Sequence, residues 1–134
     1  MSMILDIVKF IWEQLNNRTR IEVGRDFRDR HNGNKVIIRN VGNAPIIITN
    51  WELFQGNRRG YRWKESKRIA DQYDLLSDYS DLKLEGYKSV TLEFGEDNYF
   101  DWSHAALGTD QIYIRLYIAG KRRPVVREVY DGGY

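Results

Sequence analysis

The chain has 134 residues, a formal net charge of +2 and no cysteine. This length is sufficient for one buried core. The absence of cysteine excludes disulfides, thiolate metal sites and thiol nucleophiles, and it favours a reducing, cytoplasmic location. Residues 1–5 lack the basic segment of a signal peptide, and Asp6, Lys9 and Glu13 interrupt the longest apolar run, so we expect neither a leader nor a membrane span.

Charges are segregated along the chain. Residues 18–68 contain 13 Lys and Arg against 5 Asp and Glu, whereas residues 69–120 contain 3 against 10. Such a distribution favours head-to-tail self-association or a basic binding face, unless the two blocks intermix in the folded molecule.

Residues 1–17 are predicted to form an N-terminal amphipathic helix. Its apolar residues cover an arc of roughly 220°, and Asn16-Asn17 is a suitable end. The polar face is not rich in Lys or Arg, which favours a protein surface over a lipid surface. The helix packs on its own domain, on a partner chain or second copy, or on a membrane. The residues expected to bind a partner are Phe10, Ile11, Trp12 and Leu15.

From residue 20 onward the apolar period changes to two, which is typical of strands. Strands are expected at 20–23, 35–40, 46–54, 58–64, 87–94, 111–118 and 124–130, with turns at 42–45 and 55–57. Residues 65–81 show no clear period. Seven or eight short strands with regular turns predict that residues 18–134 form a single, mainly β domain, an immunoglobulin-like antiparallel β-sandwich.

Within most strands the apolar positions are two apart, so their side chains fall on one face. Ile46 and Leu53 do not share parity, which predicts a bulge or change of sheet near Thr49-Asn50. The expected core consists of Ile21, Val23, Val36, Ile38, Ile46, Ile48, Leu53, Val90, Leu92, Phe94, Ile112, Ile114, Leu116 and Val126.

Two short motifs carry a resemblance to a known family. The run 40–48, Asn-Val-Gly-Asn-Ala-Pro-Ile-Ile-Ile, resembles the Asn-x-Gly-x-x-Pro-apolar turn of Hydin-like and related bacterial immunoglobulin-like domains. Leu82-x-Leu84-x-Gly86, followed by the alternating strand 90–94, is similar to a second signature of these domains, with Glu85 at the usual proline position. The resemblance spans about residues 20–130. It implies an adhesive or scaffolding module and transfers no catalytic residue.

Candidate catalytic and metal-binding residues are few. His31 lies in a polar loop and is expected to be solvated. Asp97, Asp101 and His104 are possible metal ligands, and Ser103, His104 and Asp101 a possible triad. Both interpretations require convergence that neighbouring loop residues rarely achieve. We therefore expect Phe100 and Trp102 to plug the core at this point, and we predict no enzyme activity, no metal and no cofactor.

The segment 57–68 interleaves cations with aromatic residues. In such a pattern the cations can bind the phosphates of a nucleic acid while the aromatic rings stack on its bases. Alternatively, the rings face the core and the cations line a solvated strand face that resists aggregation. The possible nucleic-acid-binding residues are Arg58, Arg59, Tyr61, Arg62, Trp63, Lys64, Lys67 and Arg68.

The sequence thus predicts a non-catalytic protein-interaction or assembly module that uses its helix and sheet edges, with a protein partner or a second copy. The alternatives are a nucleic-acid-binding sandwich and a peripheral membrane protein held by the helix.

Overall fold

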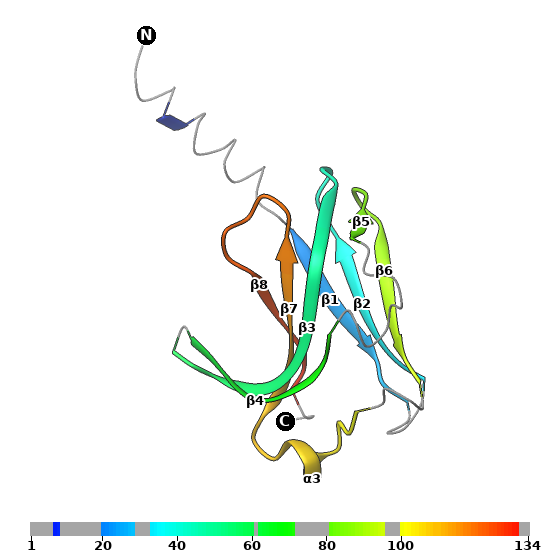
Figure 1. Cartoon of the computed structure of the whole chain (residues 1–134), viewed down its shortest axis with the longest axis vertical. Coiled ribbons are helices and arrows are strands. Elements are labelled where there is room, and N and C mark those ends of the chain that lie inside the picture. Colours follow the sequence, from blue (N-terminus) through cyan, green and yellow to red (C-terminus); the bar gives the residue numbers. More distant parts are fainter. Residues whose placement is uncertain are drawn as a thin grey trace.

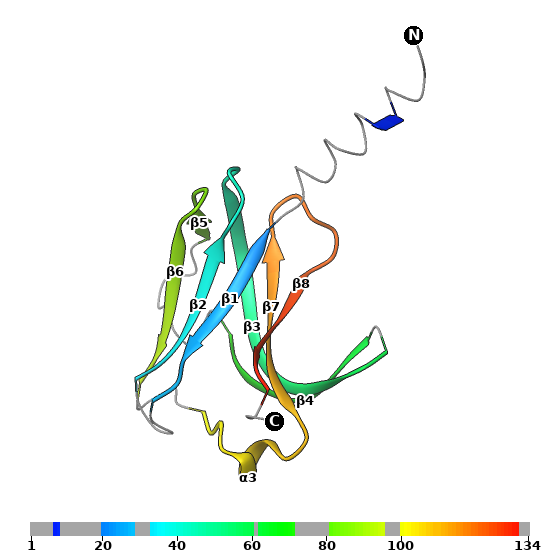
Figure 2. The same cartoon turned by 180° about the vertical axis from the view of Figure 1, so that it is seen from behind.

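The computed structural model describes residues 7–8, 20–28, 33–60, 62–71, 81–95 and 100–131. Its strands form two antiparallel sheets that lie face to face (Figures 1 and 2). In chain order the elements are β1 (Ile21–Asp26), β2 (Asn34–Asn40), β3 (Ile46–Arg59), β4 (Arg62–Asp71), β5 (Leu82–Leu84), β6 (Ser89–Phe94), α3 (His104–Leu107), β7 (Gln111–Ile118) and β8 (Val125–Tyr130). The mainly β, sandwich-like architecture is confirmed.

The two sheets differ in the number and order of their strands. One has the order β1-β2-β6, and the other has the order β4-β3-β7-β8 with β5 paired to the start of β3. Strand β3 is the longest and contributes to three pairings, with β4, β5 and β7. Because β3 extends beyond the sandwich, the hairpin that it forms with β4 curves away from the two layers (Figure 1).

One apolar cluster joins the two sheets. Val36, Ile38 and Phe94 enter it from the first sheet, and Ile48 and Leu116 enter it from the second, all fully buried. Of the predicted core residues, Val23 and Val90 pack against the cluster partly buried. The prediction for Val126 is wrong: Val125 and Val129 face the core instead. Val126 pairs with Arg115, whose side chain lies on the outer face of β7, whereas Val125 pairs with the inward-facing Leu116.

The predicted change of parity in β3 is confirmed. Ile48 pairs with Ile118 but Asn50 pairs with Tyr117, so Thr49 is an extra residue on β3. Because the extra residue shifts the alternation of β3 by one position, odd-numbered side chains face the core after the bulge. Trp51 consequently faces the core alongside Leu53, and both are fully buried.

The turn predicted at residues 55–57 does not exist. Strand β3 continues to Arg59, and the reversal occurs at Gly60, whose φ of 65° suits a two-residue hairpin loop. Gly56 lies inside the strand because the partner backbone comes close there. A Cβ at Gly56 would lie 2.1 Å from the carbonyl oxygen of Lys64. The glycine that indicated a turn therefore marks a close approach of two strands.

The two motifs that carry the family resemblance are joined in space. The buried Asn40 side chain donates from Nδ2 to the carbonyls of Ala44 (2.8 Å) and Leu84 (3.1 Å). Its Oδ1 accepts from the amide of Gly42 at 3.0 Å. A Cβ at Gly86 would lie 2.5 Å from the carbonyl oxygen of Asn43. Asn40 and Gly86 thus hold the two turns together at one end of the sandwich.

Of the predicted N-terminal helix, only Ile7 and Val8 are described, in helical backbone and exposed. The predicted partner-binding residues Phe10, Ile11, Trp12 and Leu15 lie outside the described residues, so this site stays a prediction. Within the described ranges, no helix is long and apolar enough to cross a membrane.

Candidate binding surface on the β3–β4 arm

Beyond Gly56, the last residue of β3 that pairs with β7, the β3–β4 hairpin projects from the sandwich as a two-stranded ribbon. We call residues 54–68 of this hairpin the arm. The first seven residues of β4, Arg62 to Arg68, are all exposed, whereas Ala70 at its base is buried. Pairing between the two strands is irregular at Leu53/Phe54 and at Gln55/Gly56. Because bulges bend and twist a strand, these two positions account for the curvature of the arm (Figure 1).

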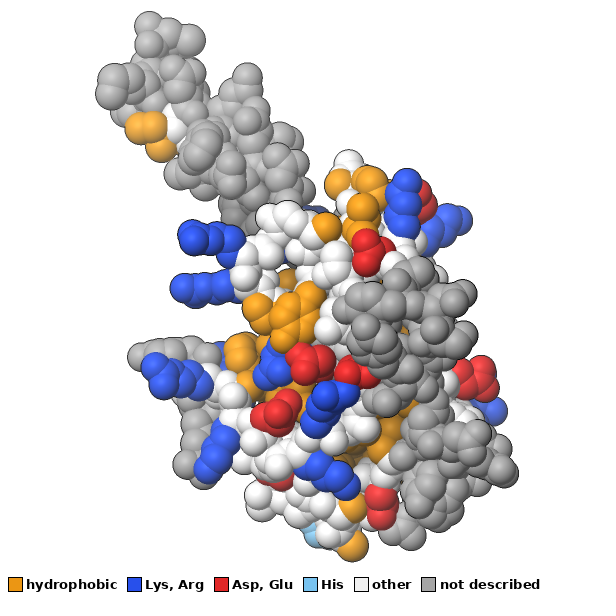
Figure 3. Space-filling model, viewed as in Figure 1, with side chains coloured by type: hydrophobic (Ala, Val, Ile, Leu, Met, Phe, Trp, Pro, Cys, Tyr) orange, Lys and Arg blue, Asp and Glu red, His pale blue; other side chains and the backbone are white. Residues whose placement is uncertain are grey.

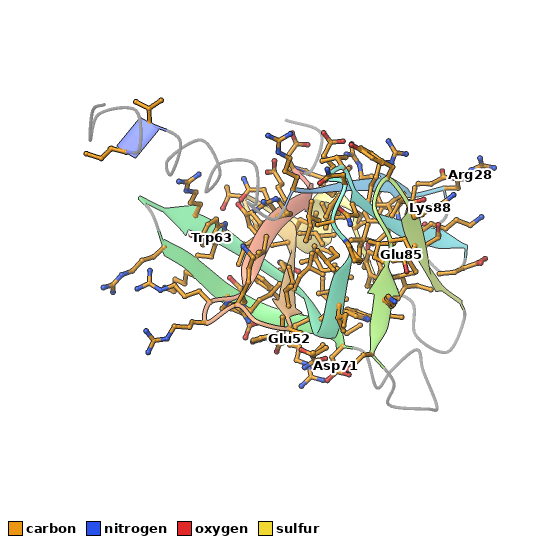
Figure 4. The ribbon with its side chains drawn as sticks, turned by 90° about the horizontal axis from the view of Figure 1, so that it is seen from above. Arg28, Glu52, Trp63, Asp71, Glu85 and Lys88 are labelled. Atoms are coloured by element: carbon orange, nitrogen blue, oxygen red, sulfur yellow. The ribbon has the colours of Figure 1, made fainter. Side chains whose placement is uncertain are left out.

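One face of the arm is turned toward the outer side of β7, the side that points away from the inter-sheet core. We call it the Trp63 face, and it consists of Phe54, Arg58, Trp63, Glu65 and Arg68. Phe54 is fully buried although it points away from the inter-sheet core, since it stacks on Tyr113 with ring centroids 5.6 Å apart. Trp63 meets Tyr113 edge-on at 6.4 Å and carries the Arg58 guanidinium 5.4 Å from its ring centroid. Trp63 points from the arm toward the rest of its sheet (Figure 4) and is 36% exposed.

Ion pairs extend the Trp63 face onto the sheet. Arg115 lies 4.6 Å from the Phe54 ring centroid and contacts Glu52 at 3.4 Å and Glu65 at 3.7 Å. Glu52 and Asp71 oppose each other across β3 and β4, an unfavourable like-charge pair. Arg68 pairs with Asp71, so each acid has its own arginine. Basic, acidic and apolar side chains are accordingly intermingled over this face (Figure 3).

Two tyrosines of β7 are perturbed by this environment. Burial raises the pKa of Tyr117, and its hydroxyl, which donates to Glu52 Oε1 at 2.5 Å, is kept protonated further by that carboxylate. Burial also raises the pKa of Tyr113, with a contribution from the charge of Glu128. Both rings therefore remain neutral, as expected for groups that pack and donate hydrogen bonds.

The opposite side of the arm is called the lysine face. It consists of Gln55, Asn57, Arg62, Lys64 and Lys67. Arg62, Lys64 and Lys67 are exposed, and none forms an ion pair with another described residue. Asp110 lies at the root of this face, where its carboxylate accepts from Asn57 Nδ2 (3.0 Å) and Gln55 Nε2 (3.1 Å). The Asn57 hydrogen bond is the main cause that lowers the pKa of Asp110.

The structure divides the predicted nucleic-acid-binding segment between the two faces. The register pairs Trp63 with Arg58, and alternation puts Lys64 with Arg62 on the opposite face. The irregularity at Gln55/Gly56 reverses the parity beyond it, so Lys67 joins Lys64 and Arg68 joins Trp63. One surface therefore does not combine the three lysine-face cations with a stacking tryptophan. Arg59 is described only through its backbone pairing with Arg62, and Tyr61 lies outside the described residues. The turn at residues 121–123 is at the far end of β7 from the arm (Figure 1).

The 100–104 segment has structural contacts of its own. Phe100 is buried and Trp102 packs against the core, which confirms that they close its end. Ser103 caps α3, accepting from the Ala106 amide at 3.3 Å, and Asp101 accepts from the Ser103 amide at 2.9 Å. His104 is exposed. Asp97 and His31 lie outside the described residues, and no cluster of three or more metal-ligating residues occurs among those described.

A further edge of the molecule is closed by arginines. Arg127 Nε of β8 donates to the Ile21 carbonyl of β1 at 3.1 Å, and Arg25 Nη1 of β1 contacts the Val129 carbonyl at 3.4 Å. Arg25 also lies 4.7 Å from the Tyr130 ring centroid. These contacts occupy the gap between the two sheets at β1 and β8. The arm, on the other side of the second sheet, has no comparable cover among the described residues.

Sequence reasoning missed the residues that build the Trp63 face from β3 and β7. Phe54, Tyr113 and Arg115 fall in predicted strands, but a continued β3 is needed to bring the arm over them. The alternation of Tyr113, Arg115 and Tyr117 on the outer side of β7 was the available indication, since large aromatic side chains on a face expected to be exposed are informative.

Comparisons with known proteins add little. No protein-family model and no curated protein matches the chain. A β-glucosidase from Listeria innocua in complex with glucose is 14% identical over 87% of this chain, which spans only 16% of that enzyme, with a TM-score of 0.35. A protein from Archaeoglobus fulgidus is 17% identical over 81% of this chain and 88% of its own, with a TM-score of 0.31. Similarity this low carries no functional argument.

Proposed function

We propose that this chain is a non-catalytic interaction module with an immunoglobulin-like sandwich, and that it contacts a protein partner through the Trp63 face of its arm. The strand order supports the fold assignment, because β1, β2 and β6 correspond to strands A, B and E, and β4, β3, β7 and β8 to C′, C, F and G. Buried Trp51 on β3 occupies the strand that carries the core tryptophan of immunoglobulin domains, here against Phe94.

The observation that carries the functional proposal is the exposed, immobilised indole of Trp63. Tryptophan, tyrosine and arginine dominate the energetics of protein interfaces. Trp63 is held between Arg58 and Tyr113 before any partner arrives. Association then costs less, since the side chain has little conformational freedom left to lose. The surrounding ion pairs resemble the polar rim that encloses such an anchor.

A cytoplasmic location remains part of the proposal, supported by the absence of cysteine. The N-terminal helix stays a second predicted contact, either with the partner or with another copy of the chain.

The test compares full-length variants as bait in quantitative affinity capture. We expect the wild type and the Ile47→Ala variant to capture the same proteins saturably. The Trp63→Ala variant should fail to retain these proteins. Ile47 is a suitable control because it is similarly exposed, at 39%, and lies outside the arm. Light scattering of the same three proteins detects a second copy as the partner. Equal capture by all three, with equal association states, would contradict the proposal.

A further inference from the structure

We propose that the lysine face of the arm binds the phosphate backbone of double-stranded nucleic acid, independently of the Trp63 face. The first observation is that the three charged residues of this face are all basic, with Asp110 confined to its root. Arg62, Lys64 and Lys67 lie on one side of a ribbon, and no described acidic residue is paired with them. Arg62 pairs with the last residue of β3 beside the hairpin loop, so the cations of this face extend toward the tip.

On the Trp63 face, by contrast, cations are paired with acidic side chains, so unpaired cations are not a general property of the arm. Arg68 and Arg115 are paired with Asp71 and Glu52, and Glu65 lies 3.7 Å from Arg115. Charged side chains, lysine especially, protect a strand edge from aggregation. Protection of the edge therefore explains why β4 carries lysine, but it does not require that all three charged residues of one face be basic. A polyanion accounts for both.

The chemistry of the lysine face favours nucleic acid over an acidic protein. Protein interfaces are depleted of lysine and centred on apolar or aromatic side chains. The lysine face offers no such side chain among its described residues, which are Gln55, Asn57, Arg62, Lys64 and Lys67. Phosphate contacts need only lysine, arginine and polar groups. Asp110 at the root is held by Gln55 and Asn57, so phosphates are expected toward the tip.

The form of the nucleic acid follows from the position of Trp63. Proteins that bind single strands set aromatic rings beside cations so that bases stack. Here Trp63 lies on the opposite face, packed against Tyr113. Among the described residues, binding through the lysine face therefore has no stacking component and suits the regular backbone of a duplex. A two-stranded ribbon is also narrow enough to enter a major groove.

The test is a fluorescence-anisotropy titration of the full-length protein with a short, mixed-sequence DNA duplex at several salt concentrations. Three phosphate contacts give a slope of log affinity against log salt of about −2.7, or a loss of about 40-fold between about 50 mM and about 200 mM salt. The variant Arg62→Gln/Lys64→Gln/Lys67→Gln should abolish this slope. Trp63→Ala should leave it unchanged, so failure here is separable from failure of the protein-partner proposal.

The matched control is Lys121→Gln/Arg122→Gln/Arg123→Gln, which removes three exposed cations from the turn at the far end of β7. We expect it to retain the salt slope. Equal loss in both triple variants would assign binding to net charge and overturn the proposal. So would absence of salt-dependent binding, equal affinity for polyglutamate, or tighter binding of a single strand that Trp63→Ala weakens. Urea unfolding of each variant verifies that it remains folded.

Discussion

The two faces of the arm differ in how their cations are used. On the Trp63 face, Arg58 lies over an indole ring and Arg68 is paired with a carboxylate. On the lysine face, Lys64 and Lys67 are exposed and have no ion-pair partner among the described residues. Both sets come from one short segment of sequence. The difference teaches that alternation along a ribbon can separate a packed, charge-balanced surface from a cationic one.

The largest difference between the two faces of the arm is expected for the substitution Phe54→Ala. Phe54 is fully buried under the Arg115 guanidinium and beside Tyr113, so truncation should lower the free energy of unfolding by about 3–5 kcal/mol. On the opposite face, Lys64→Ala should change it by less than about 0.5 kcal/mol. Urea denaturation measures both. A cost below about 1 kcal/mol for Phe54→Ala would show that the Trp63 face is not a packed surface.

A smaller effect is expected where the two strands of the arm approach most closely. Gly56→Ala places a Cβ against the Lys64 carbonyl, and the backbone must shift at a cost of about 1–3 kcal/mol. The control is Gly24→Ala in β1, because a Cβ at Gly24 would meet no atom within 4 Å. Thermal or urea unfolding should separate the two substitutions. Equal, negligible costs would mean that the pairing of Gly56 with Glu65 is wrong.

The smallest effect concerns pH and the root of the lysine face. Hydrogen bonds from Asn57 and Gln55 hold the pKa of Asp110 below 3.8. The carboxylate therefore contributes stability that is present above this ordinary value and is lost as pH falls through the lower, folded value. Asn57→Ala should raise the pKa of Asp110 and reduce the difference in stability between neutral and acidic solution.

A carboxyl NMR titration of Asp110, with unfolding measured across the acidic range, tests this prediction. A wild-type Asp110 that titrates at or above 3.8 would contradict it, as would a variant with an unchanged titration. Glu85→Gln is a suitable control, because it removes an exposed carboxylate that lies far along the chain from the arm.

Strand β7 illustrates how far periodicity leads. Its bounds, 111–118, and its inward face, with Ile112, Ile114 and Leu116, follow directly from alternation and are confirmed. The parity conflict in β3 likewise located a bulge at Thr49. In β8, the two adjacent valines Val125 and Val126 give no local indication of which one faces inward, which is why the prediction for Val126 is wrong.

The candidate site was predictable only in composition. The sequence shows the basic-aromatic segment and, as one of two alternatives, its division between two strand faces, but it does not predict the arm. The reason is Gly56: in sequence a glycine between polar residues indicates a turn, and a turn there would have ended β3 before the arm. The need for a glycine arises from the carbonyl of Lys64, eight positions further along the chain. No local pattern contains that contact.

The sequence by itself determined the class of fold, most of its core and the presence of a cation-rich, aromatic segment, because side-chain period and residue type are local properties. The tertiary structure alone decided that Asn40 joins two distant turns, that Phe54 and Tyr113 form a second buried cluster, and that Trp63 and Lys64 belong to a projecting ribbon. Each of these depends on strand register, and register is set by bulges and close backbone contacts between residues far apart in the chain.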